Sequence, residues 1–267
     1  MIPKLLVWMA CIQSPLLAIA LFYSVAAAHA ADEPGQQVPS SAELKLAGDD
    51  GGERTVTLRY LLYLPANYSA DEKAAFPLLL FLHGSGERGE DLQLVKKHGP
   101  PKLVDQEAHQ KTWPFITVSP QCPKETRWNP AELAKLVEHV ANTHRIDRRR
   151  IYVTGLSMGG SGTWSLLAER PGLFAAAMPI CGRGDPAAAE KIAKTPVWIF
   201  VGRKDKQELV ENCGELDQAL RAAGGDSKVT YYDDLPHDCW TVTYDNPAVW
   251  QWLLAHQLAE SKQTSSR

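Results

Sequence analysis

The apolar residues of this chain fall into short uninterrupted runs, which are separated by segments with helical periodicity. The runs that we predict as strands cover residues 55–64, 77–82, 115–119, 151–154, 175–180, 197–201 and 229–232. Most of them lack the polar alternation of a half-exposed strand, and strands that are buried on both faces have this pattern. The pattern therefore predicts a sheet that is covered on both sides.

The segments between these runs predict helices. They cover residues 130–144, 157–169, 187–194, 208–223 and 247–260. The first has Asn129 in the position of an N-cap and Pro130 at its first turn, where each residue type is favoured. Since strands and helices alternate along the chain, we predict an α/β fold with a mostly parallel, twisted sheet of about eight strands and helices on both faces.

The first 30 residues differ from this core. Lys4 precedes a largely apolar stretch, and the sequence Ala-His-Ala at residues 28–30 has small residues where a signal peptidase recognises its substrate. A retained membrane anchor is the alternative, because the stretch could nearly span a bilayer. Polar residues in its middle favour cleavage, which we expect before Ala31. We therefore predict a secreted or periplasmic protein without stable membrane insertion.

The remainder of the chain suits one globular domain. Of its 267 residues, 45% are hydrophobic and 22% are charged, which is typical of a soluble protein. The net charge is -3 and no basic run contains interleaved aromatic residues, so we do not expect a nucleic acid partner. The predicted divisions are a signal peptide (1–30), a flexible linker (31–43), an α/β domain (44–260) and a polar tail (261–267).

A serine between glycines carries the candidate chemistry. The predicted strand at 151–154 is followed by Gly-Leu-Ser-Met-Gly-Gly at residues 155–160, and then by a helix. A serine on so tight a turn presents its Oγ at a helix N-terminus, where backbone N–H groups stabilise a developing negative charge. The motif alone is common, but the strand before it and the helix after it favour Ser157 as a nucleophile.

Two later strand ends supply an acid and a base. Asp205 follows the strand at 197–201, and His237 follows the strand at 229–232. Taken singly, they would be read as a solvated loop acid and a surface histidine. Their placement on successive strand ends after Ser157 predicts a catalytic triad, in which Asp205 orients His237 and His237 activates the serine.

A glycine-rich loop upstream completes the predicted site. The strand at 77–82 ends in His83-Gly84-Ser85-Gly86. Such a loop can direct the backbone N–H of Ser85 toward the serine, where it would form an oxyanion hole with the N–H of Met158. An ordinary turn at a strand end is the alternative.

Five motifs together resemble the α/β-hydrolase superfamily. They are HGSGERG at 83–89, SPQCP at 119–123, GLSMGG at 155–160, PICG at 179–182 and HDCW at 237–240. Over residues 44–258 the chain resembles secreted esterases and "predicted peptidases" near dienelactone hydrolase, feruloyl and acetyl-xylan esterases, and polyhydroxybutyrate depolymerases. The resemblance implies a serine hydrolase that needs no metal or organic cofactor, and the triad with its acyl-enzyme favours carboxylic esters, small or polymeric.

Aromatic residues near the site predict the kind of substrate. Trp128 and Trp240 could each stack on a sugar or phenolic ring, which would favour esters linked to a polysaccharide or a phenol; packing against the loops is the alternative. The short segment 182–195 leaves no room for a lid. A serine peptidase of the prolyl-oligopeptidase type and a non-catalytic carbohydrate-binding protein on a hydrolase scaffold remain alternative functions.

Four cysteines follow the predicted signal peptide. They show no C-x-x-C spacing and no paired histidines, so a zinc site is not supported. Because the acid and the base of the triad must meet, we expect Cys213 and Cys239 to come close, and we predict a disulfide between them. Cys122 and Cys181 follow strands that two others separate, about 14 Å apart, so we predict free thiols there.

Overall fold

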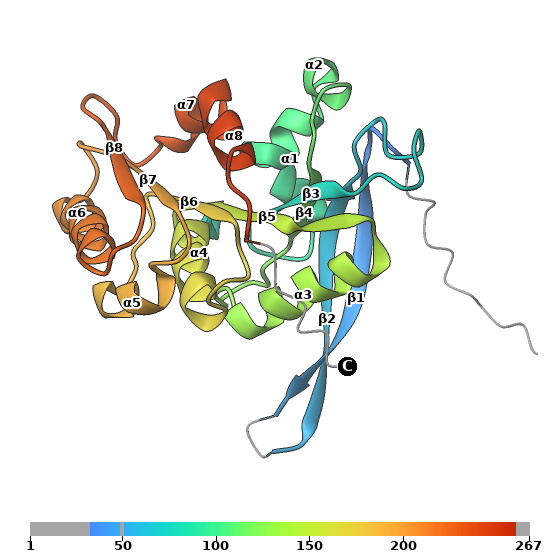
Figure 1. Cartoon of the computed structure of the whole chain (residues 1–267), viewed down its shortest axis with the longest axis horizontal. Coiled ribbons are helices and arrows are strands. Elements are labelled where there is room, and N and C mark those ends of the chain that lie inside the picture. Colours follow the sequence, from blue (N-terminus) through green and yellow to red (C-terminus); the bar gives the residue numbers. More distant parts are fainter. Residues whose placement is uncertain (1–32, 49–50, 260–267) are drawn as a thin grey trace, which may run out of the picture.

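A computed structural model describes residues 33–48 and 51–259 of the chain and shows one eight-stranded sheet between two layers of helices (Figure 1). The strand order is β1-β2-β4-β3-β5-β6-β7-β8. The strands are β1 (Gln37–Ala47), β2 (Glu53–Tyr63), β3 (Phe76–Leu82), β4 (Ile116–Pro120), β5 (Ile146–Leu156), β6 (Ala176–Ile180), β7 (Val197–Gly202) and β8 (Ser227–Tyr232). β1 and β2 pair antiparallel, as do β2 and β4, whereas all the other neighbours are parallel. The predicted fold is confirmed.

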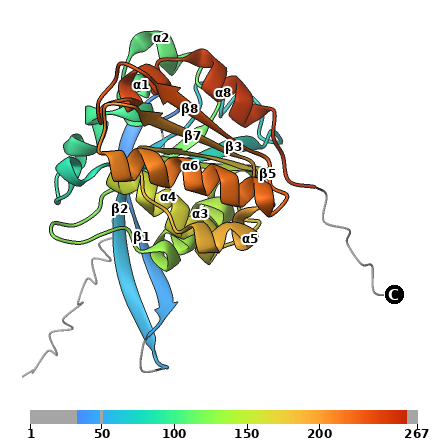
Figure 2. The same ribbon diagram turned by 90° about the vertical axis from the view of Figure 1, so that its left-hand side faces the viewer.

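Helices cover both faces of the sheet. Helices α3, α4, α5 and α6 lie on one face, and α1, α7 and α8 lie on the other (Figures 1 and 2). The helices are α1 (Gly99–Val104), α2 (Glu107–Gln110), α3 (Pro130–Thr143), α4 (Met158–Glu169), α5 (Ala189–Ile192), α6 (Gln207–Ala222), α7 (Trp240–Tyr244) and α8 (Pro247–Leu254), with short 3-10 turns η1 (Ser85–Glu87), η2 (Leu92–Lys97) and η3 (Pro186–Ala188). As predicted, Asn129 caps α3, because its Oδ1 accepts hydrogen bonds from the N–H groups of Ala131 and Glu132.

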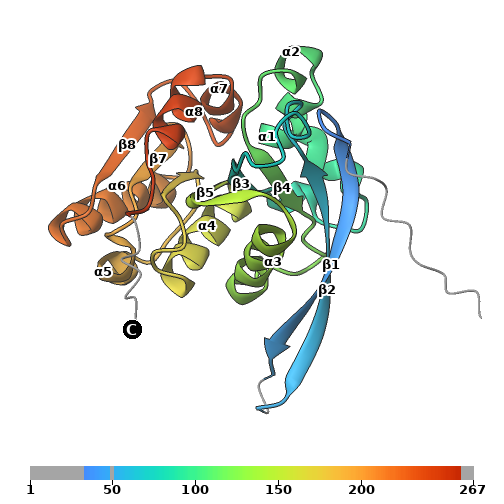
Figure 3. The same ribbon diagram turned by 45° about the vertical axis from the view of Figure 1, so that its right-hand side comes forward.

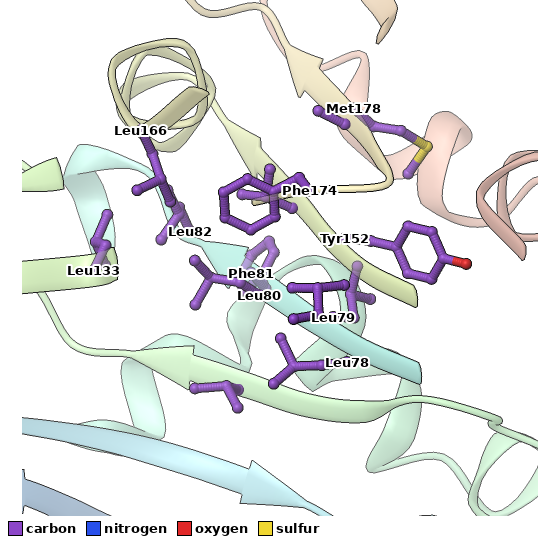
Figure 4. Packing of buried hydrophobic residues seen from close by; sticks show 14 of the residues in the cluster. Leu78, Leu79, Leu80, Phe81, Leu82, Leu133, Tyr152, Leu166, Phe174 and Met178 are labelled. Atoms are coloured by element: carbon purple, nitrogen blue, oxygen red, sulfur yellow. The ribbon is translucent and has the colours of Figure 1, made fainter. Parts of the chain in front are cut away.

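The core centres on β3, which lies between β4 and β5. Every residue of this strand is buried, and its side chains contact residues from the helix layers and the adjacent strands (Figure 4). Leu133 of α3 and Leu166 of α4 belong to the same cluster. A fully buried leucine stabilises the fold by about 1.5–3 kcal/mol relative to an exposed one. The strand end that leads into the candidate site is therefore held in the buried core.

The predicted linker at 31–43 is wrong in its second half, because β1 begins at Gln37. From Ala42 onward β1 alternates buried and exposed side chains, and Ala42 lies opposite Leu58 of β2. In segment 37–41 no side chain is buried, so its pairing with β2 is what makes it a strand. The two strands form the long hairpin that extends past the rest of the sheet (Figure 3).

Three other predictions fall outside this description. The predicted signal peptide, its cleavage site before Ala31 and the tail at 261–267 all lie beyond the described residues. Across the described ranges, no helix is both long enough and apolar enough to cross a bilayer.

Candidate active site

Ser157 occupies the turn between β5 and α4 in a strained conformation. Its φ of 53° and ψ of -112° place it in a region that residues with side chains rarely adopt. The Ser157 N–H donates to the Ile180 carbonyl at 2.9 Å, and the Ser157 carbonyl accepts from the Ser161 N–H at 3.0 Å. The turn is thus held by the end of β6 and by the first turn of α4, and this keeps the strained serine in place.

Two glycines allow this turn to form. A Cβ on Gly159 would lie 1.9 Å from the carbonyl oxygen of Leu82, and a Cβ on Gly155 would lie 2.4 Å from the carbonyl oxygen of Gly159. Both distances are far below any ordinary contact, so α4 can approach the ends of β3 and β5 only because these residues lack side chains. These glycines lie two residues before and two residues after Ser157, and this spacing is what makes the sequence motif recognisable.

His237 links Ser157 to Asp205. Its Nε2 lies 2.9 Å from Ser157 Oγ, and its Nδ1 lies 2.6 Å from Asp205 Oδ2. The Asp205 side chain is 3% exposed and the His237 side chain 45% exposed. With Nδ1–H donating to the carboxylate, Nε2 is the acceptor for the serine hydroxyl. Asp205 Oδ1 accepts from the Lys206 N–H at 2.7 Å, so both carboxylate oxygens have partners. The structure brings the three predicted residues together.

Gly202, at the end of β7, allows two loops to approach each other. They are the acid loop (residues 203–206), which carries Asp205, and the base loop (residues 233–239), which carries His237. A Cβ there would lie 2.2 Å from the carbonyl oxygen of Pro236. The Lys204 N–H donates to the Leu235 carbonyl at 3.0 Å, which joins the two loops directly. The sequence analysis did not single out Gly202, although its position just before the acid loop is a usable signal.

Ser85 and Met158, the two residues predicted to form an oxyanion hole, lie beside Ser157 on the wall of one cavity. Ser85 begins η1 and Met158 begins α4, so both have backbone N–H groups without intrahelical acceptors. Both residues line the same cavity as Ser157 and His237, which has a volume of about 1030 Å³. The N-terminus of α4 also favours negative charge at this position. The two N–H groups can therefore stabilise an oxyanion formed on a carbonyl that Ser157 attacks.

His83 supports the Ser85 loop, and the sequence analysis gave it no role of its own. Its Nε2 accepts a hydrogen bond from the Cys122 N–H at 3.0 Å, and its Nδ1 lies 2.6 Å from the Gly84 carbonyl oxygen. The imidazole meets both partners only when Nδ1 alone carries a proton. Burial lowers the pKa of His83, which favours this neutral form.

The two predicted pocket tryptophans do not line the cavity around Ser157. Trp128 packs over Gly162 of α4, and its Nε1–H donates to the His83 carbonyl at 3.1 Å. The Trp240 ring meets the ring of His237 edge-on, with 5.5 Å between centroids. Trp128 therefore holds the Ser85 loop and Trp240 holds the base, so the packing alternative describes both residues.

The predicted Cys213–Cys239 disulfide is wrong: the four cysteines of the described ranges are buried free thiols. Cys239 lies close enough to Cys181 for the two thiols to influence each other. The reason is the path of the base loop, which must pass from β8 across β7 and β6 to reach Ser157. This path puts Cys239 over the end of β6, where Cys181 lies. Burial raises the pKa of Cys181 and raises that of Cys213 to about 12.

Known proteins share this architecture and part of the sequence. A thermostable esterase of known structure is 32% identical with a TM-score of 0.69, over 81% of this chain and 63% of that chain. The feruloyl esterase module from Clostridium thermocellum, solved with sinapinate, has a TM-score of 0.57 over 78% of this chain and 85% of its own. At 18% identity it shows the fold alone.

A curated relative adds a match at the level of sequence. The bifunctional acetylxylan esterase/xylanase of Neocallimastix patriciarum is 26% identical over 149 residues, which are 54% of this chain and 21% of that protein. The chain thus spans about a fifth of this relative's length. Residues 117–246 match the dienelactone hydrolase family, and this segment contains Ser157, Asp205 and His237. The chain has the α/β-hydrolase fold, and its residues 117–246 are similar to the dienelactone hydrolase family.

Proposed function

We propose that the protein is a serine hydrolase that cleaves carboxylic esters through an acyl-enzyme. The observation that carries this proposal is the unbroken hydrogen-bonded chain from Ser157 through His237 to Asp205, with heavy-atom distances of 2.9 and 2.6 Å. These three side chains line a cavity and are not enclosed in the core. A nucleophile, a base within reach and an acid that orients the base together constitute the apparatus for acyl transfer.

The reaction follows from the geometry. His237 Nε2 takes the proton of the Ser157 hydroxyl as Oγ attacks the ester carbonyl, and Asp205 stabilises the imidazolium that forms. The N–H groups of Ser85 and Met158 stabilise the oxyanion of the tetrahedral intermediate. His237 then protonates the departing alcohol. Water, activated by the same histidine, attacks the acyl-enzyme and releases the acid.

Esters rather than amides are the proposed substrates. An alcohol leaves more readily than an amine, so this apparatus is sufficient for esters. Support comes from two similar proteins, which are a thermostable esterase and a bifunctional acetylxylan esterase/xylanase. Esters linked to a polysaccharide or a phenol are within the proposed range.

Export is part of the proposal. The predicted signal peptide at 1–30 would direct the protein to the periplasm or the medium, with cleavage before Ala31. N-terminal sequencing of the protein from those fractions tests this directly. A mature chain that retains residues 1–30 would contradict it.

The decisive experiment compares the wild type with Ser157→Ala. The assays are labelling by a fluorophosphonate, hydrolysis of acetate and butyrate esters, and hydrolysis of a peptide substrate. We expect Ser157→Ala to lose labelling and to lose ester hydrolysis by a factor of roughly 10⁴ or more. Ser165→Ala is the matched control, because Ser165 lies on the same helix and its hydroxyl donates to the Ser161 carbonyl.

Each outcome discriminates between functions. Faster turnover of the peptide than of every ester would favour the peptidase. Absence of both labelling and turnover in the wild type would favour the carbohydrate-binding alternative. Full ester turnover by Ser157→Ala would show that another group is the nucleophile.

A further inference from the structure

A buried carboxylate lies beside the predicted oxyanion hole and has no part in the reaction steps above. Glu87 ends η1, the turn that begins with Ser85, and its side chain is only 5% exposed. Its Oε2 lies 3.1 Å from the position that a Cβ on Gly84 would occupy, so the carboxylate lies against the backbone just before Ser85. Burial removes the hydration of a charged group, and a carboxylate in this place therefore needs partners from the protein.

Two partners of Glu87 are neighbours in the sequence. Lys97 Nζ lies 3.7 Å from Glu87 Oε1, and His98 Nε2 lies 3.8 Å from the same oxygen. The Lys97 side chain is exposed, whereas that of His98 is half-buried. Solvent screens the contact with the lysine more strongly, so the imidazole is the more firmly placed of the two partners.

The backbone at His98 is fixed by packing against the core. His98 is the N-cap residue of α1, and the next residue, Gly99, has a φ of 63°. A Cβ on Gly99 would lie 2.6 Å from the ring of Phe81 in β3 and 3.0 Å from the ring of Tyr244 in α7. The segment therefore lies directly against both elements, and this contact determines where the imidazole of His98 is presented.

The ring of His98 also contacts the segment that carries the base. It meets the ring of Trp240 with 5.5 Å between centroids and 65° between planes. Trp240 in turn meets the ring of His237 at 5.5 Å and 88°. Trp240 Nε1 is buried and has no hydrogen-bond partner within residues 33–48 and 51–259, so the indole is held by packing and edge-on ring contacts.

We propose that His98 is a positioning residue, whose imidazole joins the Ser85 loop to the base. It contacts Glu87 on the side of the Ser85 loop, and it contacts Trp240 on the side of His237. The proposal rests on the proposed function of the same site. The N–H groups that stabilise the oxyanion and the imidazole that takes the proton must keep one geometry relative to each other in the transition state. Since the two lie on segments far apart in the sequence, a side chain that contacts both segments maintains this geometry.

Three substitutions of His98 separate the two contacts. His98→Ala removes both of them. His98→Phe keeps a ring against Trp240 but removes the nitrogen beside Glu87, whereas His98→Gln keeps an N–H group for Glu87 but removes the ring.

The expected effect is on turnover rather than on substrate binding. We expect His98→Ala to lower kcat on an ester that the wild type hydrolyses by roughly tenfold and to change KM by less than about twofold. His98→Phe and His98→Gln should each recover part of this loss. A role in stability alone would lower the melting temperature and leave the kcat of the folded protein unchanged, so all variants are assayed well below their melting temperatures.

Double-mutant cycles test the path of the effect. If His98 acts through Trp240 and Glu87, His98→Ala should cost less in kcat when it is added to Trp240→Leu or to Glu87→Gln than when it is added to the wild type. The full tenfold loss in both backgrounds would show that His98 acts by another route, and it would overturn the proposal.

His109→Ala is the matched control. His109 of α2 meets the ring of Trp113 edge-on, with 6.2 Å between centroids, and neither residue lines the cavity around Ser157. The substitution removes a histidine–tryptophan contact of the same kind without touching the Ser85 loop or the base. We expect kcat and KM to equal those of the wild type.

The outcomes are distinct from those that test the function itself. If the wild type hydrolyses esters and His98→Ala keeps its kcat, the positioning role is wrong and the ester hydrolase remains. An equal loss of kcat in His109→Ala and His98→Ala would also overturn the proposal, because the effect would then come from the fold in general. If Ser157 is not labelled by the fluorophosphonate and the wild type hydrolyses no ester, the proposed function fails and this inference fails with it.

Discussion

Replacing Gly159 by alanine tests whether the close approach of α4 to β3 sets the position of the nucleophile. The added Cβ would lie 1.9 Å from the Leu82 carbonyl oxygen and 2.7 Å from the His83 carbonyl oxygen. Contacts below 3.0 Å are essentially never observed for a real Cβ, and both neighbours are backbone atoms that no side-chain rotation can remove. The first turn of α4 must therefore move away from the end of β3 by about 1 Å.

The magnitude follows from two opposing effects. Overpacking in a well-packed region destabilises a protein by about 1–3 kcal/mol. Alanine is also a better helix former than glycine by about 1 kcal/mol, which offsets part of this loss. With a net loss of roughly 1 kcal/mol, we expect a melting temperature lower by about 2–4 °C. The same displacement moves Ser157 Oγ and the Met158 N–H, and a shift of about 1 Å can reduce the rate roughly 100-fold.

The assay is calorimetry together with kcat/KM on an ester that the wild type hydrolyses. Gly86→Ala is the control for stability, because a Cβ at Gly86 meets no atom within 4 Å. We expect its melting temperature to equal that of the wild type. If Gly159→Ala keeps both the melting temperature and the turnover of the wild type, the reasoning about this turn is refuted.

Three further predictions concern the triad acid, a buried histidine and the thiols. Asp205→Asn should lower kcat about 10⁴-fold, because the imidazole loses the partner that fixes its tautomer; more than a tenth of wild-type turnover would contradict this role. Burial lowers the pKa of His83 from 6.5, so the unfolded chain binds this proton more readily; the free energy of unfolding should decrease as pH falls below 6.5, and the decrease should be smaller in His83→Gln. The pKa of Cys213 is raised to about 12, so iodoacetamide at pH 8 should label this thiol only after unfolding in urea, and labelling of the native protein would disprove its burial.

Local patterns in the sequence were sufficient to predict the elements of the sheet core and the serine turn. Continuous apolar runs occur where a strand is buried on both faces, and this applies to β3, whose residues are all buried. Gly155 and Gly159 flank Ser157 at a spacing that only a tight strand-to-helix turn requires. Asp205 and His237 lie in the loops that follow two parallel strands, so their place at the same edge of the sheet could be expected from chain order.

Other features depend on which distant segments lie next to each other in the fold, and only the tertiary structure determines these. Residues 37–41 form a strand because they pair with β2. The sequence of this segment has no alternation of apolar and polar residues that would predict the pairing. Cys239 meets Cys181 because the base loop crosses the end of β6, a path set by the sheet order. Arg88, Arg127 and Arg183 are far apart in the sequence and line one cavity in the folded chain. Burial and periodicity are encoded by near neighbours, whereas the surroundings of a side chain depend on segments distant along the chain.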